Sequence, residues 1–226
     1  MKYPDIKTYE ILYARFLLED RSKQMMDLVG DLEGKVFMDI CCGSGKLTKE
    51  AISMNTKKNI MIDAEATMIK DNFWCAKVAD IYVEEVQNAF IKLFGNYYDK
   101  IDVAVCQQGI NYWLDKDKAK RLSLLMKKGG IFVFNTFNQK PSTFPSTREY
   151  SLKNIYGKIR HYIEVSWRIE GEHNDVQHVQ ICEGIEPHFT KFKWMDEEYI
   201  RNCLDKFFEI EIITDGKTDI YRCVKK

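Results

Sequence analysis

Short apolar runs alternate with amphipathic segments over the first 135 residues. The apolar runs cover residues 35–40, 59–62, 74–79, 101–106 and 131–135. Apolar side chains at helical spacing cover residues 9–29, 81–94 and 116–127, and a further helical segment begins at Thr67. Strands that alternate with helices are typical of parallel βαβ units. Right-handed crossovers place the helices of such units on both faces of one sheet.

The pattern changes after Phe137. Apolar and polar side chains alternate over residues 159–170 and again over 176–182, and a turn cluster at 171–175 joins the two segments. This predicts an antiparallel hairpin inserted after the fifth strand. Helical spacing returns at 196–204, and residues 207–214 and 219–224 flank the turn at 215–217. The chain is therefore expected to end in a second antiparallel hairpin.

Length and composition narrow the class of protein. The 226 residues suit one domain, or one domain with an insertion, and 45% hydrophobic residues indicate a globular chain. Lys+Arg and Asp+Glu both number 34, so the sequence lacks the basic excess of a nucleic-acid-binding protein. No apolar run reaches the length of a membrane span, and the first residues have no signal-peptide core. We expect a cytoplasmic protein with no membrane and no nucleic-acid partner.

Cysteine and histidine spacing argues against disulfides and metal. The seven cysteines are odd in number and include no Cys-x-x-Cys pair, which favours reduced thiols. The four histidines lie at 161, 173, 178 and 188, without the helical pair that many zinc sites use. We expect no bound metal.

The most informative segment joins the first strand to the next helix. Val36 to Ile40 is apolar apart from Asp39, residues 41–45 read Cys-Cys-Gly-Ser-Gly, and Leu47 and Ala51 begin a helical pattern. In a parallel sheet, a ligand binds outside the carboxyl end of the strands, at turns of this kind. Glycines let the backbone approach the ligand, and the helix N-terminus offers free N–H groups.

Two nucleotide-binding patterns fit this turn poorly. A phosphate-binding P-loop needs Ser or Thr directly after its lysine, whereas Leu47 follows Lys46. A nicotinamide dinucleotide site needs glycines where the chain has Cys41 and Lys46. A nicotinamide-dependent oxidoreductase therefore remains only as an alternative.

The turn resembles the first motif of the class I S-adenosylmethionine-dependent methyltransferases, specifically the small-molecule "methyltransferase domain 11/25" type. That motif reads Asp-Leu-Gly-Cys-Gly-Ser/Thr-Gly, and residues 39–45 read Asp-Ile-Cys-Cys-Gly-Ser-Gly. The departure is Cys41, which stands where the family usually has its first glycine. Residues 125–130, Leu-Met-Lys-Lys-Gly-Gly, resemble the family's approach to its fifth strand, with Lys128 in place of proline.

The resemblance implies a set of cofactor-binding residues. Asp63, at the end of the second apolar run, matches the acid that accepts the ribose hydroxyls. Met68 matches a position that packs on the adenine, and Asp80 and Ile81 match the third motif, where an acid and the next N–H meet the adenine. The implied cofactor-binding residues are Asp39, Cys41, Gly43, Gly45, Asp63, Ala64, Met68, Asp80, Ile81 and Gln107.

The resemblance also implies an architecture and an activity. The fold would be α/β, a Rossmann-like doubly wound, mostly parallel seven-stranded sheet with an antiparallel C-terminal hairpin. Residues 1–226 would form a single methyltransferase domain, with an N-terminal helical cap at 1–34 and an inserted lid at 139–194. The protein would move a methyl group from S-adenosylmethionine directly to a small-molecule acceptor and release S-adenosylhomocysteine.

No residue identifies itself as a catalytic base, and several roles stay open. The weak candidates are Tyr112, His161 and His178, with Glu164 as a further guess. Tyr112 and Phe137 follow the fourth and fifth strands, where an acceptor would enter; each acid taken alone could instead be a turn cap or a solvated loop residue. Beside the nicotinamide-dependent oxidoreductase, two further alternative functions remain: methylation of tRNA or another nucleic acid, and non-catalytic binding of S-adenosylmethionine.

Overall fold

The structure is a computed structural model that describes residues 6–13, 21–69, 78–136, 145–154, 156–169, 175–214 and 219–226. It divides into two compact units. One comprises Met1–Asp20 and Gln139–Trp194, and the other comprises Arg21–Asn138 and Met195–Lys226. Residues 1–34, predicted as one cap, are thus divided between the units, whereas the predicted lid at 139–194 falls in the smaller one. The single-domain organisation stays a prediction.

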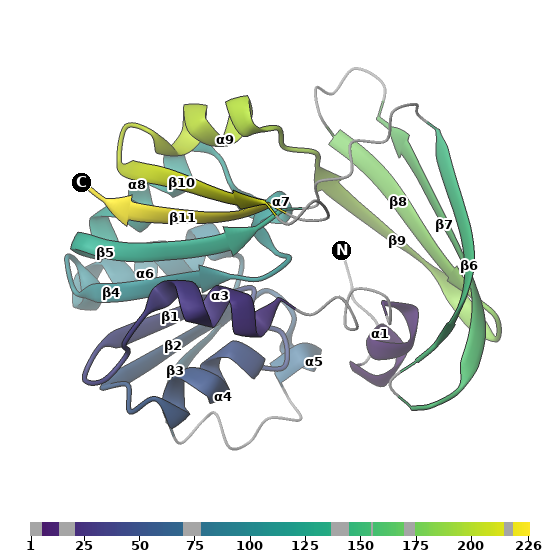
Figure 1. Cartoon of the computed structure of the whole chain (residues 1–226), viewed down its shortest axis with the longest axis horizontal. Helices are drawn as coiled ribbons and strands as arrows, with labels where there is room; N and C mark the ends of the chain where they lie inside the picture. Colours follow the sequence, from purple (N-terminus) through teal and green to yellow (C-terminus); the bar gives the residue numbers. More distant parts are fainter. Residues whose placement is uncertain are drawn as a thin grey trace. The chain divides into compact units, whose positions relative to one another are not determined.

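The larger unit is built on a seven-stranded sheet with the order β10-β11-β5-β4-β1-β2-β3 (Figure 1). Its strands are β1 (Val36–Ile40), β2 (Lys58–Asp63), β3 (Ala79–Val83), β4 (Ile101–Cys106), β5 (Met126–Asn135), β10 (Phe208–Thr214) and β11 (Asp219–Lys225). The first five strands are parallel, and β11 pairs antiparallel with both β5 and β10. The predicted doubly wound, mostly parallel sheet with an antiparallel C-terminal hairpin is confirmed.

Helices cover both faces of this sheet. They are α3 (Ser22–Val29), α4 (Lys46–Ser53), α5 (Ala66–Ile69), α6 (Val86–Tyr97), α7 (Ile110–Trp113), α8 (Lys116–Leu125) and α9 (Glu197–Leu204). Successive strand residues point to opposite faces, so Phe37 packs with the side chains of α3 and α4, whereas Met38 packs with those of α6, α8 and α9. Burial on both faces explains why β1, β2, β4 and β5 are apolar runs rather than alternating ones.

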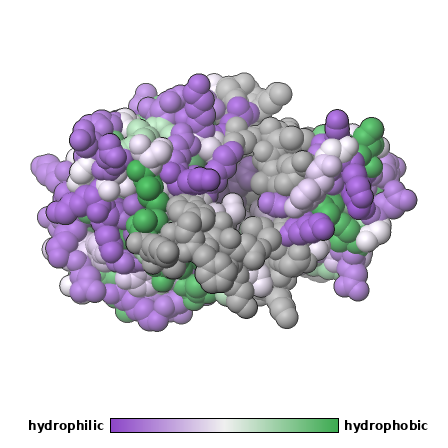
Figure 2. Space-filling model, turned by 90° about the horizontal axis from the view of Figure 1, so that it is seen from below, coloured by the Kyte–Doolittle hydropathy of each residue, from purple (hydrophilic) through white to green (hydrophobic). Residues whose placement is uncertain are grey.

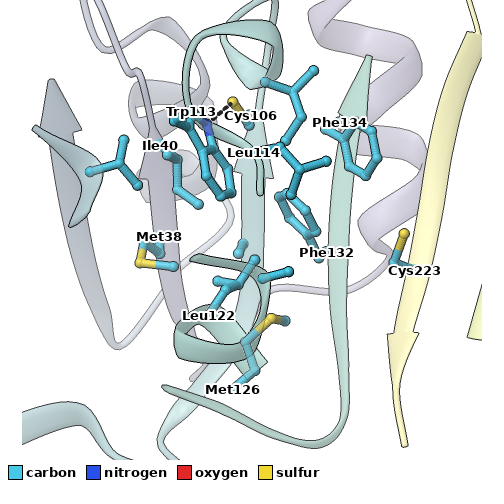
Figure 3. Packing of buried hydrophobic residues seen from close by; sticks show 14 of the residues in the cluster. Met38, Ile40, Cys106, Trp113, Leu114, Leu122, Met126, Phe132, Phe134 and Cys223 are labelled. Carbon is cyan, nitrogen blue, oxygen red and sulfur yellow. Dashed lines mark hydrogen bonds between the residues drawn. The ribbon is translucent and has the colours of Figure 1, made fainter. Parts of the chain in front are cut away.

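The core on the α6–α8–α9 face contains a group of aromatic rings among aliphatic side chains (Figure 3). Phe132 and Phe134 of β5 lie 4.9 Å apart between ring centroids, and Tyr221 of β11 stacks on Phe134. Trp113 of α7 reaches the same cluster, and its indole N–H donates to Cys106 Sγ at 3.4 Å. The buried indole nitrogen thus has a partner, and α7 is fixed beside the end of β4.

Several predicted boundaries are wrong. The third strand covers Ala79–Val83 instead of 74–79, and its helix begins at Val86 instead of 81; residues 74–77 lie outside the described part of the chain. Helix α8 ends at Leu125 instead of 127, and β5 begins at Met126 instead of 131, with Gly129 and Gly130 at an irregularity where its register with β4 shifts. Gly129 has a φ of 76°, and a Cβ on Gly130 would lie 2.9 Å from the Lys127 carbonyl oxygen.

The smaller unit is an antiparallel four-stranded sheet with the order β6-β7-β8-β9. Its strands are β6 (Ser146–Lys153), β7 (Ile159–Arg168), β8 (Asp175–Cys182) and β9 (Ile185–Lys193), and helix α1 (Ile6–Leu12) packs on it through Leu12. The predicted hairpin corresponds to β7 and β8, whereas the sequence pattern does not predict the outer strands β6 and β9. The predicted turn at 171–175 lies outside the described residues except for Asp175, which begins β8. The predicted turn at 215–217, Phe137 and His173 also lie outside the described residues.

Register divides the side chains of the four-stranded sheet between two faces. One face, which we call the polar face, carries Tyr150, Tyr162, Glu164, Ser166, His178, Gln180, His188 and Thr190, and the same register places Leu152, Val176, Cys182 and Phe192 on it. The opposite face is mixed and carries Ile163, Val165, Trp167 and Phe189 together with Glu149, His161, Gln177 and Lys191. The polar face contains buried members, whereas Phe189 is 56% exposed.

The coloured part of the face drawn in Figure 2 is mostly polar. Seen from below, hydrophilic residues cover most of the coloured surface, and hydrophobic residues form small groups among them (Figure 2). Among the described helices, none has the length and apolar character needed to cross a bilayer.

Candidate functional site

The turn after β1, residues 41–45, is wound by left-handed backbone. Cys41, Gly43 and Gly45 have φ values of 58°, 50° and 73°. Glycine adopts this conformation readily, whereas at Cys41 it is unfavourable for an L-residue. The Cys42 N–H donates to the Ile62 carbonyl at 3.0 Å, which joins the turn to the end of β2. We call this segment the β1 turn; it leads directly into α4.

Asp39, near the end of β1, connects this strand to helix α4 through hydrogen bonds with Thr48. Its side chain is buried, and Oδ2 accepts hydrogen bonds from the Thr48 hydroxyl at 2.8 Å and the Thr48 N–H at 3.2 Å. Burial raises the pKa of Asp39 to about 7, although the two hydrogen bonds from Thr48 oppose the increase. The observed contacts of Asp39 are therefore with the scaffold of the turn.

Asp63 closes the same turn from the end of β2. Its Oδ2 accepts from the Gly43 N–H at 2.8 Å, and its Oδ1 accepts from the Glu65 N–H at 2.9 Å. Burial raises the pKa of Asp63, the two backbone hydrogen bonds lower it, and the nearby charges of Glu65 and Glu85 raise it. A carboxylate can accept about four hydrogen bonds, so Asp63 retains capacity for a ligand hydroxyl.

Met68 and Ala64 lie beside Asp63. Met68 is 8% exposed, and a Cβ on Gly43 would lie 3.7 Å from its methyl carbon, so the Met68 side chain borders the turn. Ala64 is exposed. The structure thus brings Gly43, Asp63 and Met68 together, as their predicted roles require.

Asp80 is the predicted site residue whose position differs most from expectation. It occupies the second position of β3, opposite Ile60, and so does not follow the carboxyl end of the strand. Its carboxylate accepts from Lys58 Nζ at 2.6 Å and from the Tyr97 hydroxyl at 2.5 Å. Burial raises the pKa of Asp80, but these two hydrogen bonds outweigh it and the net shift is downward. Ile81 packs instead with a small cluster formed by Cys42, Met61 and Ile69.

The turn after β4, residues 107–109, lies at the same edge of the sheet. The Ser22 hydroxyl donates to the Gln107 side-chain oxygen at 3.0 Å. Gln108 has a φ of 57°, and its N–H donates to the Asn135 side chain at 2.7 Å. We call this segment the β4 turn. Sequence reasoning selected Gln107 and missed Gly109 and Asn135, although Asn135 ends a predicted strand at this edge.

Cys41 joins the two turns. Its Sγ lies 3.9 Å from the Gly109 carbonyl oxygen. A hydrogen bond with Cys106 and burial raise the pKa of the Cys41 thiol well above its ordinary value, so this thiol is neutral at physiological pH. The carboxyl ends of β1, β2, β4 and β5 thus form one connected edge.

The three candidate catalytic residues, Tyr112, His161 and His178, lie in different surroundings. Tyr112 is 41% exposed on the short helix α7. His178 lies buried on the polar face, where its ring nitrogens contact the Ser166 hydroxyl at 2.9 Å and Gln180 Oε1 at 3.2 Å. His161 lies on the opposite face, exposed and 2.8 Å from Glu149. Within the described residues, no group of three or more His, Cys, Asp or Glu side chains is arranged to hold a metal ion.

The carboxyl-end edge has the properties of a site for a nucleoside-type cofactor. It offers a glycine-bearing turn without a Cβ at Gly43, an acid with remaining acceptor capacity at Asp63, and an apolar side chain at Met68. This combination suits a ribose and an adenine ring more than a phosphate, because Asp63 lies where a phosphate would be repelled. The residues present therefore fit S-adenosylmethionine.

Comparisons with known proteins agree with this geometry. The sequence profile of a family described as "Methyltransferase domain" matches residues 31–200. No curated protein sequence matches the chain. Among solved structures, several methyltransferases are similar to it in fold.

An S-adenosylmethionine-dependent methyltransferase from Clostridium acetobutylicum is 18% identical, with a TM-score of 0.64, over 96% of this chain and 91% of that chain. S-adenosylmethionine-bound CalS10, an amino pentose methyltransferase from Micromonospora echinaspora, is 11% identical, with a TM-score of 0.71, over 100% of both chains. The sugar N-methyltransferase KedS8 from a Streptoalloteichus species is 11% identical, with a TM-score of 0.60, over 95% of this chain and 88% of that chain. At these identities the likeness shows a common fold.

Proposed function

We propose that this chain, which belongs to the class I S-adenosylmethionine-dependent methyltransferase family, methylates a small polar acceptor that carries an amino or hydroxyl group. The cofactor is S-adenosylmethionine, which supplies a methyl group activated by its sulfonium charge. The protein's own residues then have to bind the acceptor, orient it toward the methyl group and exclude water from the site.

The larger unit supplies cofactor binding in this proposal. The residues that would hold S-adenosylmethionine are the β1 turn, Asp63, Met68 and Gln107. Asp63 already fixes Gly43, so one carboxylate both shapes the turn and offers acceptors to ribose hydroxyls. Asp39 acts through the turn by fixing the start of α4 through Thr48.

The smaller unit contains a buried hydrogen-bond network on the polar face of its four-stranded sheet. The Tyr150 hydroxyl donates to Glu164 Oε1 at 2.5 Å, and Gln180 Nε2 donates to the Tyr150 oxygen at 3.3 Å. His178 continues this network from Gln180. Glu164 is 6% exposed and Gln180 is fully buried. Burying such groups is costly unless hydrogen bonds compensate, and here the buried groups hydrogen-bond to one another.

This network is suited to bind a ligand rich in hydrogen-bond donors and acceptors. A carboxylate, a phenol and an imidazole can each hydrogen-bond an amine or hydroxyl group of such a ligand. CalS10 and KedS8 act on sugars, which makes amino sugars the first acceptor class to test. The balanced numbers of basic and acidic residues argue against a nucleic-acid acceptor.

The test is S-adenosylhomocysteine formation, measured by mass spectrometry, with amino sugars, their hydroxyl counterparts and unmodified tRNA as acceptors. We expect turnover with a polar small molecule, and a kcat/KM reduced about tenfold or more by Glu164→Gln. Glu149→Gln is the matched control, because Glu149 lies on the same sheet but on the opposite, exposed face. Turnover with tRNA alone would replace the small-molecule proposal with a nucleic-acid acceptor, and cofactor binding without any turnover would favour a binding protein.

A further inference from the structure

We propose that Cys41 and Gly109 are a matched pair in which the glycine makes room for the cysteine and thereby positions the β1 turn for the cofactor. This inference rests on the cofactor site assigned above. It makes Gly109 a positioning residue that acts through Cys41.

The backbone conformation at Cys41 is strained for a residue with a side chain, which indicates that the side chain has a role. Its φ of 58° falls in the left-handed region, where glycine is favoured and other L-residues are strained. The matching position in the resembling family is usually glycine. The side chain is directed to Gly109 and Cys106 at the end of β4, so it links two strands that are adjacent in the sheet.

Gly109 is required for space and not for its backbone conformation. Its φ is −110° and its ψ is −15°, values that residues with side chains adopt readily. A Cβ at this position would lie 2.4 Å from Cys41 Cβ, 2.8 Å from Cys41 Sγ and 3.1 Å from Cys106 Sγ. Carbon atoms in contact normally lie about 3.5–4.0 Å apart. The identity of residue 109 is therefore dictated by residue 41.

A Cβ added at residue 109 would displace the β1 turn, which borders the cofactor site, rather than the β4 turn. The β4 turn is anchored by the Gln108 N–H on Asn135 and by α7, whose Trp113 is packed in the core. The atom closest to the added Cβ is the Cβ of Cys41, which has no rotamer to escape into. Displacing Cys41 displaces the adjoining turn, including the Gly43 N–H that donates to Asp63.

A four-member mutant cycle tests the pair: the unaltered protein, Gly109→Ala, Cys41→Gly and the double variant. The readouts are the dissociation constant for S-adenosylhomocysteine by calorimetry and the unfolding midpoint in urea. We expect Gly109→Ala to weaken binding about tenfold or more, and the double variant to bind within about threefold of Cys41→Gly. Cys41→Ala combined with Gly109→Ala should remain impaired, because alanine keeps the clashing Cβ.

Gly95→Ala is the control, since a Cβ there meets nothing within 4 Å. Equal losses from Gly109→Ala in the unaltered protein and in the Cys41→Gly variant would overturn the proposal, as would unchanged binding by Gly109→Ala. If Gly109→Ala fails to fold, recovery of folded protein by Cys41→Gly supports the pair, and failure of both overturns it. Absence of binding by the unaltered protein would refute the cofactor site instead, and the urea midpoints would still measure the coupling.

Discussion

The buried carboxyl of Asp39 gives a pH dependence of stability that can be worked out in advance. Its pKa is about 7 in the folded protein, against 3.8 for an ordinary aspartate. The folded state therefore binds the Asp39 proton more tightly than the unfolded state does, so stability is lost as pH rises from 3.8 through about 7. Integrating this linkage from about pH 5 to about pH 8 gives a loss of roughly 2–3 kcal/mol in unfolding free energy.

Asp39→Asn is the perturbation that isolates this effect. The amide keeps an oxygen that can accept from the Thr48 hydroxyl, but it does not ionise. Relative to the unaltered protein, we expect the variant to gain about 2–3 kcal/mol of stability between about pH 5 and about pH 8. The measurement is urea unfolding followed by circular dichroism at both pH values. Comparing the two proteins removes the contribution of Asp63 apart from its charge interaction with Asp39, which belongs to the measured effect.

A stability difference between the two proteins that is the same at both pH values would refute the reasoning. It would mean that the Asp39 carboxylate is compensated in the folded state beyond its contacts with Thr48. A difference of the opposite sign would mean that the ionised form is the one that the fold stabilises.

Three further predictions follow from individual contacts. Asp63→Asn should weaken S-adenosylhomocysteine binding about tenfold or more, whereas Asp80→Asn should change it less than about twofold, because Asp80 lies away from the end of β3; equal calorimetric losses would contradict this. Phe132→Ala should lower the unfolding free energy by about 3–5 kcal/mol, since Phe132 is fully buried among aromatic rings; a loss below about 1 kcal/mol in urea would contradict it. Gly130→Ala should lower the thermal midpoint, because its Cβ would lie 2.9 Å from a backbone oxygen; an unchanged midpoint would contradict that clash.

The parts of the fold that the sequence predicted are those with a local signal. Strands β1, β2, β4 and β5 are buried on both faces and are therefore apolar runs that can be recognised directly. Strand β3 lies at the edge of its sheet and carries Asp80. Because this strand is not an apolar run, the apolar pattern placed it at 74–79 instead of 79–83. The outer strands β6 and β9 are edges too, with charged residues in β6 and Pro187 in β9.

The site shows the same division between local and long-range information. Residues Gly43, Gly45 and Asp63 could be selected from sequence because a turn and a strand end are local patterns. The fit of Gly109 to Cys41 depends on the pairing of β1 with β4, which no spacing along the chain reveals. The polar face of the four-stranded sheet was equally hidden, because alternation predicts two faces without saying which face is buried.

The most direct test of the account is calorimetric titration of the unaltered protein with S-adenosylhomocysteine and, separately, with NAD. We expect S-adenosylhomocysteine to bind and NAD not to bind, and Asp63→Ala to weaken the first interaction because Asp63 shapes the β1 turn. Binding of NAD without binding of S-adenosylhomocysteine would contradict the assignment of the carboxyl-end edge as a methyl-donor site.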